Sequence, residues 1–174
     1  EPLGGSNDPL RGTKGTTWEG GQRVPAIVRW PERIPAGRVS DELVTAMDLY
    51  PTLAAVGGAE VPADRIIDGC DIKELWFEEA PSPHEAFFYY WMNDLEAVRS
   101  GRWKLHFSKH GAEESALFDL DVDPGETTDV SAGHQDVVAR LDAIAETARS
   151  TLGDARIGRE PSEARPIGRV PDPA

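Results

Sequence analysis

The sequence predicts an α/β protein, in its α+β form within this chain, from three patterns of apolar residues. A short apolar run between two prolines covers residues 25–31, aromatic and alternating segments fill residues 87–107, and apolar residues recur at helical spacing from 136 to 150. Alternation with period 2 is typical of a half-buried strand, and a period of 3.6 is typical of an amphipathic helix. We therefore expect a buried strand, a small antiparallel sheet and an amphipathic helix.

The N-terminal third is expected to hold a loop, two strands and a helix. Residues 1–23 are rich in Gly and Thr and show neither period, which indicates a loop. Residues 25–31 predict a buried strand, and residues 42–45 predict a second short one. Asp48 has the character of an N-cap for a helix that ends at the two glycines at 57–58.

The rest of the chain predicts a strand-rich region that ends in a helix. The expected strands lie at residues 87–91, 95–99, 103–107 and 117–120, with turns at 100–101 and 123–125. The clearest helix covers residues 136–150. The tail that follows is expected to be an extended strap or disordered. These elements predict a division into residues 1–58, 59–83 (a connecting segment), 84–152 and 153–174.

Composition excludes several function classes. The chain has 174 residues, of which 39% are hydrophobic, and a net charge of −13. This length fits one domain, or two small ones, and no apolar run has the roughly 20 residues of a membrane-spanning helix. We expect no nucleic acid and no membrane as a partner, because both are anionic. The single cysteine, Cys70, excludes an intrachain disulfide framework, a Cys-rich zinc site and an iron–sulfur cluster.

The charge distribution points to the N-terminal quarter as the place to bind an anion. Residues 1–40 hold six basic and four acidic residues, whereas the remainder carries a net charge of −15. Lys14 stands between Gly12 and Gly15, and two threonines follow it. An amine on a glycine-rich loop, near hydroxyl and backbone N–H donors, suits an oxyanion. The loop lacks the Gly-Lys-Ser/Thr ending of a Walker A motif, and most loops of this composition bind nothing.

The string from Pro9 to Ala26 closely resembles the loop of type I sulfatases, the arylsulfatases, that carries the active-site lysine of that family. The resemblance continues in the family's order over roughly residues 4–150. Its other motifs lie at residues 27–31 with 34–37, 47–53, 67–69, 98–105, and 117–120 with 123–126. The chain therefore resembles the C-terminal portion of such an enzyme.

This resemblance implies a fold and an activity. A large mixed sheet flanked by helices would be followed by a small antiparallel subdomain with a packed helix. This chain would hold the last part of the large sheet, at about residues 24–58, and the small subdomain, at about 84–150. The implied reaction is hydrolysis of a sulfate monoester, in which Lys14 contacts a sulfate oxygen and neutralises charge as the S–O bond breaks.

The residues around Lys14 have a different expected role. Arg11 and Trp18 are secondary candidates for substrate contact. Arg11, Trp18, Glu19 and Arg23 are, however, better explained as residues that fix the loop, because an Arg–Glu pair within a loop is usually local bracing.

The chain departs from the family pattern at the nucleophile and the metal. The Cys/Ser-x-Pro-x-Arg motif, whose first residue becomes the formylglycine nucleophile of the family, is not found in this sequence. Cys70 stands in a different context and is interpreted as an incidental thiol. Asn7 and Asp8 occur in the reverse of the family's Asp-Asn order, and hard cations need six or more oxygen ligands. We therefore expect no metal site in this chain, and calcium or magnesium only in the full-length family enzyme.

Two other patterns mimic metal sites. His106 and His110 are four residues apart on a strand-to-loop segment, so they should not converge on zinc, and surface or half-buried positions are expected for the four histidines. Asp119, Asp121 and Asp123 imitate the start of an EF-hand loop, but Val130 stands where its twelfth residue would be Glu. A turn at a strand end is the preferred interpretation.

Three functional hypotheses remain open. The first is part of a sulfatase, inactive alone because it lacks nucleophile and metal ligands. The second is a non-catalytic module that forms homo-oligomers or exchanges a strand through residues 25–30. The third is a phosphate- or phosphonate-ester hydrolase of the wider alkaline phosphatase superfamily. Neither the sulfated substrate nor the cellular compartment follows from the sequence.

Overall fold

The computed structural model describes residues 5–110 and 112–165. The chain divides into two compact units: residues up to Arg23 together with those from Ala86 onward, and residues Val24–Glu85. The sequence predicts that residues 1–23 belong with residues 24–58. In the structure, the N-terminal loop instead belongs to the same unit as the C-terminal sheet.

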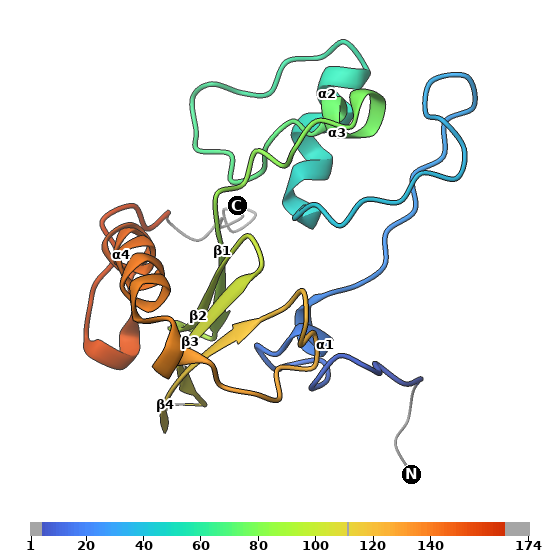
Figure 1. Ribbon diagram of the computed structural model, residues 1–174. Coiled ribbons are helices and arrows are strands. Elements are labelled where there is room, and N and C mark those ends of the chain that lie inside the picture. Colours follow the sequence, from blue (N-terminus) through green and yellow to red (C-terminus); the bar gives the residue numbers. More distant parts are fainter. Residues whose placement is uncertain (1–4, 111, 166–174) are drawn as a thin grey trace. The chain divides into compact units, whose positions relative to one another are not determined.

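A four-stranded antiparallel sheet forms the centre of the first unit (Figure 1). The strands follow one another in chain order and consist of β1 (Phe87–Trp91), β2 (Asp94–Ser100), β3 (Trp103–Lys109) and β4 (Ala112–Asp119). Neighbouring strands are joined by short connections, as in a meander. The predicted strands at 87–91, 95–99 and 103–107 are confirmed. The strand predicted at 117–120 is the end of a longer one that begins at Ala112.

One face of the sheet packs against α4 (Gln135–Thr151), as Figure 1 shows. Leu105 and Leu117 from the sheet and Leu141 from the helix are among the fully buried side chains of this core. Trp103 and Phe107 lie on the same side as Leu105, which the alternation in β3 predicts. The predicted helix at 136–150 is thus confirmed, and it covers the apolar face of the sheet.

The other face of the sheet is covered by the N-terminal loop. Trp18 packs with Ala116, Phe118 and Leu120 in a second buried cluster. Its ring centroid lies 4.5 Å from that of His106 and 5.9 Å from that of Phe118. Both faces of the sheet are therefore buried, although the strands alternate between apolar and polar residues.

The second unit contains short helices joined by loops. They are a 3₁₀ turn (Ala46–Asp48), α2 (Leu49–Val56) and α3 (Lys73–Glu78). The helix predicted after Asp48 is confirmed, and Gly57 follows its last residue. Gly69 is needed for close approach, because a Cβ there would lie 2.1 Å from the carbonyl oxygen of Met47.

The strands predicted at 25–31 and 42–45 are wrong as elements. Both segments are described, and both lie outside the sheet in irregular backbone. Ile27 is 94% exposed and Val24 is 77% exposed. A strand forms only where a neighbour satisfies its backbone groups, and the described residues provide no such neighbour for 25–31.

The described part of the tail runs back along the end of α4. Ser162 N donates to Ser150 O at 3.1 Å, and Glu163 N donates to Thr151 O at 3.0 Å. The sequence left two possibilities for the tail, an extended strap or disorder, and these bonds agree with the strap for residues 153–165. Residues 166–174 lie outside the described residues. Among the described residues, no helix combines the length and apolar character that crossing a membrane requires.

Candidate functional site

The lysine loop, residues 9–23, is closed by its own hydrogen bonds. Thr16 donates to Thr13 O twice, from its backbone N at 3.1 Å and from its hydroxyl at 2.8 Å. Gly20 N donates to Arg11 O at 2.8 Å, which joins the two ends of the loop. The turn from Thr13 to Thr16 therefore holds Lys14 at its corner.

Asn7 and the glycines of α1 (Glu19–Gln22) make the loop compact. The Asn7 side-chain amide donates to Gly12 O and Gly20 O, each at 3.0 Å. At Gly21 a Cβ would lie 2.2 Å from Thr16 O, so no larger residue fits there without moving the loop. The Gly-Gly pair after Glu19 is thus required by the close approach of two backbone segments.

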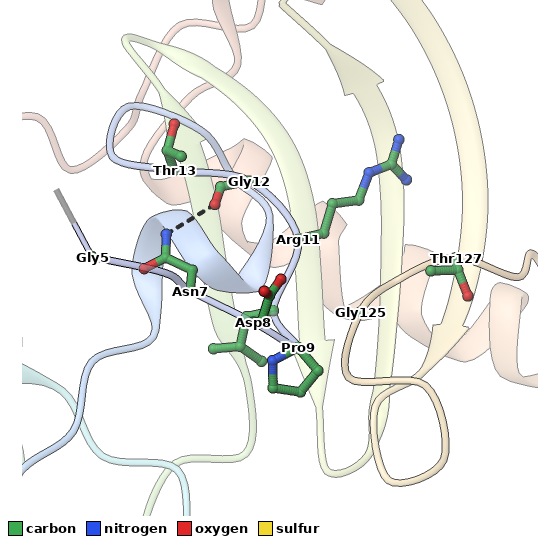
Figure 2. A pocket seen from close by; sticks show the side chains of 10 residues that line it. Gly5, Asn7, Asp8, Pro9, Arg11, Gly12, Thr13, Gly125 and Thr127 are labelled. Carbon is green, nitrogen blue, oxygen red and sulfur yellow. Dashed lines mark hydrogen bonds between the residues drawn. The ribbon is translucent and has the colours of Figure 1, made fainter. Parts of the chain in front are cut away.

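Lys14 is exposed at the tip of this loop, and other residues of the loop line a hollow of about 530 Å³. Asn7, Asp8 and Thr13 are among the residues that line the hollow, and Gly125 and Thr127 line its other side (Figure 2). Lys14 follows Thr13 in the chain but is not itself a lining residue. The predicted substrate contact of Lys14 stays a prediction.

Arg11 and Trp18 hold the loop against the sheet. The Arg11 guanidinium donates to Glu126 O at 2.9 Å, and its Cζ lies 3.7 Å from the centre of the Trp18 ring. Figure 2 shows Arg11 directed towards the strands, although its residue also lines the hollow. Trp18 is only 7% exposed. These contacts agree with the loop-fixing role expected for both residues, and their contact with substrate stays a prediction.

Beneath the loop lies a group of buried ionisable residues, here called the ion cluster: Glu19, Lys104, His106 and Glu126. The Lys104 ammonium donates to Thr17 O at 2.8 Å and to Glu19 Oε1 at 2.9 Å, and it lies 2.9 Å from Glu126 Oε1. Its three N–H groups thus have three oxygen partners. Such pairing is what allows full charges to be buried.

The carboxylates of the ion cluster bind the loop directly. Glu126 Oε2 accepts a hydrogen bond from Glu19 N at 2.6 Å. Glu19 Oε1 also accepts from the Tyr89 hydroxyl at 2.8 Å, and Arg99 forms an ion pair with Glu19 Oε2 at 3.4 Å. β1, β2, β3 and the segment after β4 therefore all contribute a side chain to the base of the loop.

A second set of contacts fixes Thr17. Its hydroxyl donates to Glu96 Oε2 at 2.6 Å and accepts from the Lys109 ammonium at 2.7 Å. The Lys109 Nζ also lies 3.9 Å from the centre of the Trp18 ring. Burial lowers the pKa of Lys109 to about 8, even though nearby Glu96 raises it.

The surroundings of His106 in the cluster favour its neutral form. Burial lowers the pKa of His106 below its ordinary value, and the positive charge of Lys104 adds to the effect. Its Nε2 donates to Glu126 Oε1 at 2.9 Å, which leaves Nδ1 buried without a hydrogen-bond partner among the described residues. Burial by itself raises the pKa of Glu126, but the bond from His106 and the charge of Lys104 outweigh it and hold that pKa below its ordinary value.

These two shifts predict that the chain loses stability as the pH falls. A folded-state pKa below the unfolded value means that the unfolded chain binds more protons, so the stabilisation is complete above the unfolded pKa and is lost below it. For His106 the loss begins near its ordinary value of 6.5. We expect the free energy of unfolding, measured by urea denaturation, to fall from pH 7 to pH 5.

His106→Gln is the matched variant for this pH dependence. Glutamine retains an N–H donor for Glu126 but does not titrate. The free energy of unfolding of His106→Gln should therefore change less between pH 7 and pH 5 than that of the unchanged chain. Equal slopes for the two proteins would contradict the assignment of this loss to His106.

The ion cluster was missed in the sequence, and the placement predicted for His106 is wrong. A surface or half-buried position was expected, whereas His106 is 1% exposed. The available signal was the polar half of β3, where Lys104, His106 and Ser108 alternate with apolar residues. Alternation predicts a solvated second face, and only the N-terminal loop, far away in the sequence, turns that face into a second core.

Among the described residues, one group has side chains of the kinds that bind metal ions, and it lies in the second unit. It consists of Asp48, Cys70 and His84, whose possible ligand atoms lie within 4.8 Å of one another. The Asp48 carboxylate already accepts from Thr45 N at 2.6 Å, Cys70 N at 2.8 Å and His84 Nε2 at 2.8 Å. Burial and the charge of Asp48 raise the pKa of the Cys70 thiol. The group thus ties three loops together, and its surroundings favour the protonated thiol of the cysteine.

The acidic sequence after β4 forms the predicted turn. Asp119 pairs with Arg102, and Asp123 accepts from Thr127 N and Thr128 N, both at 2.8 Å. These carboxylates are therefore occupied by the backbone and by an arginine, as expected for a turn at a strand end.

Comparison with known proteins gives a consistent result. Residues 13–150 match the family model described as N-sulphoglucosamine sulphohydrolase, C-terminal. The chain is 37% identical over 183 residues to an arylsulfatase of Hemicentrotus pulcherrimus, covering 86% of this chain and 33% of that protein. It is 39% identical over 189 residues to a steryl-sulfatase of Mus musculus, covering 89% of this chain and 30% of that protein.

A solved structure agrees with these relatives. The structure of Ps i-CgsB in complex with k-i-k-neocarrahexaose superposes with a TM-score of 0.70 at 32% identity, covering 82% of this chain and 32% of that one. The chain thus spans about a third of the length of the relatives that it matches. The small antiparallel sheet with its helices matches the fold of these sulfatases. The family match, the relatives and the fold agree that this chain belongs to the sulfatase family and corresponds to its C-terminal part.

Proposed function

We propose that this chain is part of an enzyme that hydrolyses sulfate monoesters, and that Lys14 contacts the sulfate group. The observation that carries the proposal is that the match to the C-terminal sulfatase model begins at residue 13 and includes Lys14. The exposure of Lys14 at the tip of a closed loop, directly after Thr13, which lines a hollow, supports it. There the ammonium would neutralise charge on a sulfate oxygen as the S–O bond breaks.

The same reasoning limits what the chain does alone. The sequence has no Cys/Ser-x-Pro-x-Arg motif to supply a nucleophile. Asn7 and Asp8 carry the amide and carboxylate oxygens among the residues that line the hollow, whereas calcium and magnesium take six or more oxygen ligands. The residues near the loop therefore do not fit a calcium or magnesium site, and we propose that any such ion belongs to other parts of the full-length family enzyme. The isolated chain is accordingly proposed to be inactive.

The test is an assay of the full gene product that contains this chain. We expect it to hydrolyse 4-nitrophenyl sulfate, and we expect Lys14→Ala to lower kcat by about 10²–10³-fold, the usual cost of losing one charge-stabilising group. Lys73→Ala removes an exposed lysine from the second unit and should leave kcat unchanged. Equal rates for Lys14→Ala and the unchanged enzyme would refute the role of Lys14.

Two further arms separate the alternatives. Faster hydrolysis of 4-nitrophenyl phosphate than of 4-nitrophenyl sulfate would favour the hypothesis of a phosphate-ester hydrolase of the same superfamily. The purified 174-residue chain should turn over neither ester. Activity that persists in a Lys14→Ala preparation of that chain would be traced to a contaminating enzyme.

We also propose that residues 25–30 associate with a second copy when the chain is isolated. The segment lies outside the sheet and carries Ile27 at 94% exposure, so it offers apolar surface to another strand. We expect a mass above that of the monomer in sedimentation experiments. Ile27→Lys should restore the monomer because an edge charge opposes pairing, whereas Ile157→Lys, at another exposed isoleucine, should not. A monomeric unchanged chain would contradict this proposal.

A further inference from the structure

The lysine loop is attached to the sheet through its backbone at two places. Lys104 Nζ donates to Thr17 O at 2.8 Å, and these residues are 87 apart in the sequence. Glu126 Oε2 accepts from Glu19 N at 2.6 Å, and these residues are 107 apart. Residues of β3 and of the segment after β4 thus hold the backbone on both sides of Trp18, whatever side chains the loop carries.

The Glu19 carboxylate makes this attachment specific for one position. It is 1% exposed and has Lys104, Tyr89 and Arg99 as its partners. A buried carboxylate is costly without such partners, and hydrogen bonds and ion pairs have narrow distance limits. A shift of the loop along the sheet would break these bonds without releasing the charge to water. Glu19 therefore selects one placement of the loop.

Short and stiff connections carry that placement to Lys14. Only Gly15 and Thr16 separate Lys14 from Thr17, and Thr16 is bonded to Thr13 O by its N and its hydroxyl. Thr16 O accepts from Gln22 Nε2 at 3.2 Å and would lie 2.2 Å from a Cβ at Gly21, so α1 packs directly on this turn. The tip cannot move far while residues 17–19 stay in place.

We propose that Glu19 is a positioning residue for Lys14, and that Lys104 and Glu126 support it, so that the small sheet sets where the amine stands. The inference rests on the proposed function. Glu19 and Lys104 do not contact the substrate, and they act by holding the loop in the geometry that charge neutralisation requires. Misplacement of a catalytic group by about 1 Å can cost on the order of 10²-fold in rate.

The first test uses amide hydrogen exchange on the purified 174-residue chain. In Glu19→Gln the Gly20 and Gly21 amides, which donate within the loop, should exchange at least about tenfold faster. The Val98 and Leu105 amides of the sheet should keep their protection, which shows that the chain has folded. Lys14→Ala should leave all four amides unchanged. Unaltered loop exchange in Glu19→Gln would overturn the inference, whether or not Lys14 is catalytic.

The second test is a double-mutant cycle in the full gene product with 4-nitrophenyl sulfate. Glu19→Gln should lower kcat at least about tenfold when Lys14 is present and should have little further effect in Lys14→Ala, because the two act through one group. Equal losses in both backgrounds would assign Glu19 a general structural role and overturn the inference. A Lys14→Ala enzyme with full activity would instead refute the proposed function, and the exchange experiment would still decide the positioning.

A milder variant guards against failure to fold. Tyr89→Phe removes only the hydroxyl that donates to Glu19 Oε1 at 2.8 Å and keeps the ring in place. It should change loop exchange and kcat in the same direction as Glu19→Gln, by a smaller factor. Glu74→Gln, at an exposed first-turn glutamate of α3, is the matched control and should change neither.

Discussion

Lys104→Met is expected to lower the free energy of unfolding by about 3–5 kcal/mol, the usual effect of removing one partner of a buried ion pair. Lys104 is fully buried, and its ammonium contacts Thr17 O, Glu19 and Glu126. The substitution keeps an unbranched apolar stem but leaves two carboxylates without their shared cation. Most of the loss comes from those unpaired charges.

The matched control is Lys73→Met. Lys73 also pairs with an aspartate, Asp71, but its side chain is 41% exposed. Because water screens an exposed pair, this variant should lose less than about 1 kcal/mol. Urea denaturation of both variants measures the difference. If Lys104→Met lost no more stability than Lys73→Met, the cluster would contribute nothing beyond an ordinary surface pair.

Leu141→Ala is expected to lower the free energy of unfolding by about 2–5 kcal/mol. Leu141 is 0% exposed and packs from α4 onto Leu105 and Leu117 in the core of the sheet. Truncation removes buried apolar surface and leaves a cavity that rigid strands cannot close. The residue contributes only packing, so the loss measures how far the sheet depends on α4.

Leu152→Ala tests the same change just beyond the end of that helix. Leu152 is 50% exposed, and its replacement should change the free energy of unfolding by no more than about 0.5 kcal/mol. Thermal and urea unfolding monitored by circular dichroism compare the two variants. Similar losses in both would show that the helix does not pack on the sheet as described.

The activity measurements on Lys14→Ala and Glu19→Gln and the unfolding measurements on Lys104→Met and Leu141→Ala address different parts of the molecule. Lys14 is exposed and, within the part of the chain that the structure describes, pairs with no core residue, so Lys14→Ala should affect turnover and leave stability nearly unchanged. Leu141→Ala should affect stability first. Glu19 and Lys104 lie between these extremes, because they are buried in the core and hold the loop that carries Lys14.

The sequence by itself determined the strands at 87–91, 95–99 and 103–107, the helices after Asp48 and over 136–150, and the family. These features depend on local periodicity, capping and short motifs, which are properties of neighbouring residues. A loop-fixing role was expected for Arg11 and Glu19 from an Arg–Glu pair within the loop. The structure instead gives Arg11 the carbonyl of Glu126 and gives Glu19 the side chains of Lys104 and Arg99 as partners.

Only the tertiary structure decided that the polar face of β3 is a second core. The alternation in β3 predicts that Lys104 and His106 face solvent. Their partners are far away in the sequence, since Glu19 is 85 residues from Lys104 and Glu126 is 20 residues from His106. The strand predicted at 25–31 is wrong for the same reason. An apolar run shows that a segment prefers burial, but it does not show which residues bury it. Pairing of buried charges and pairing of strands both depend on distant residues, which periodicity does not encode.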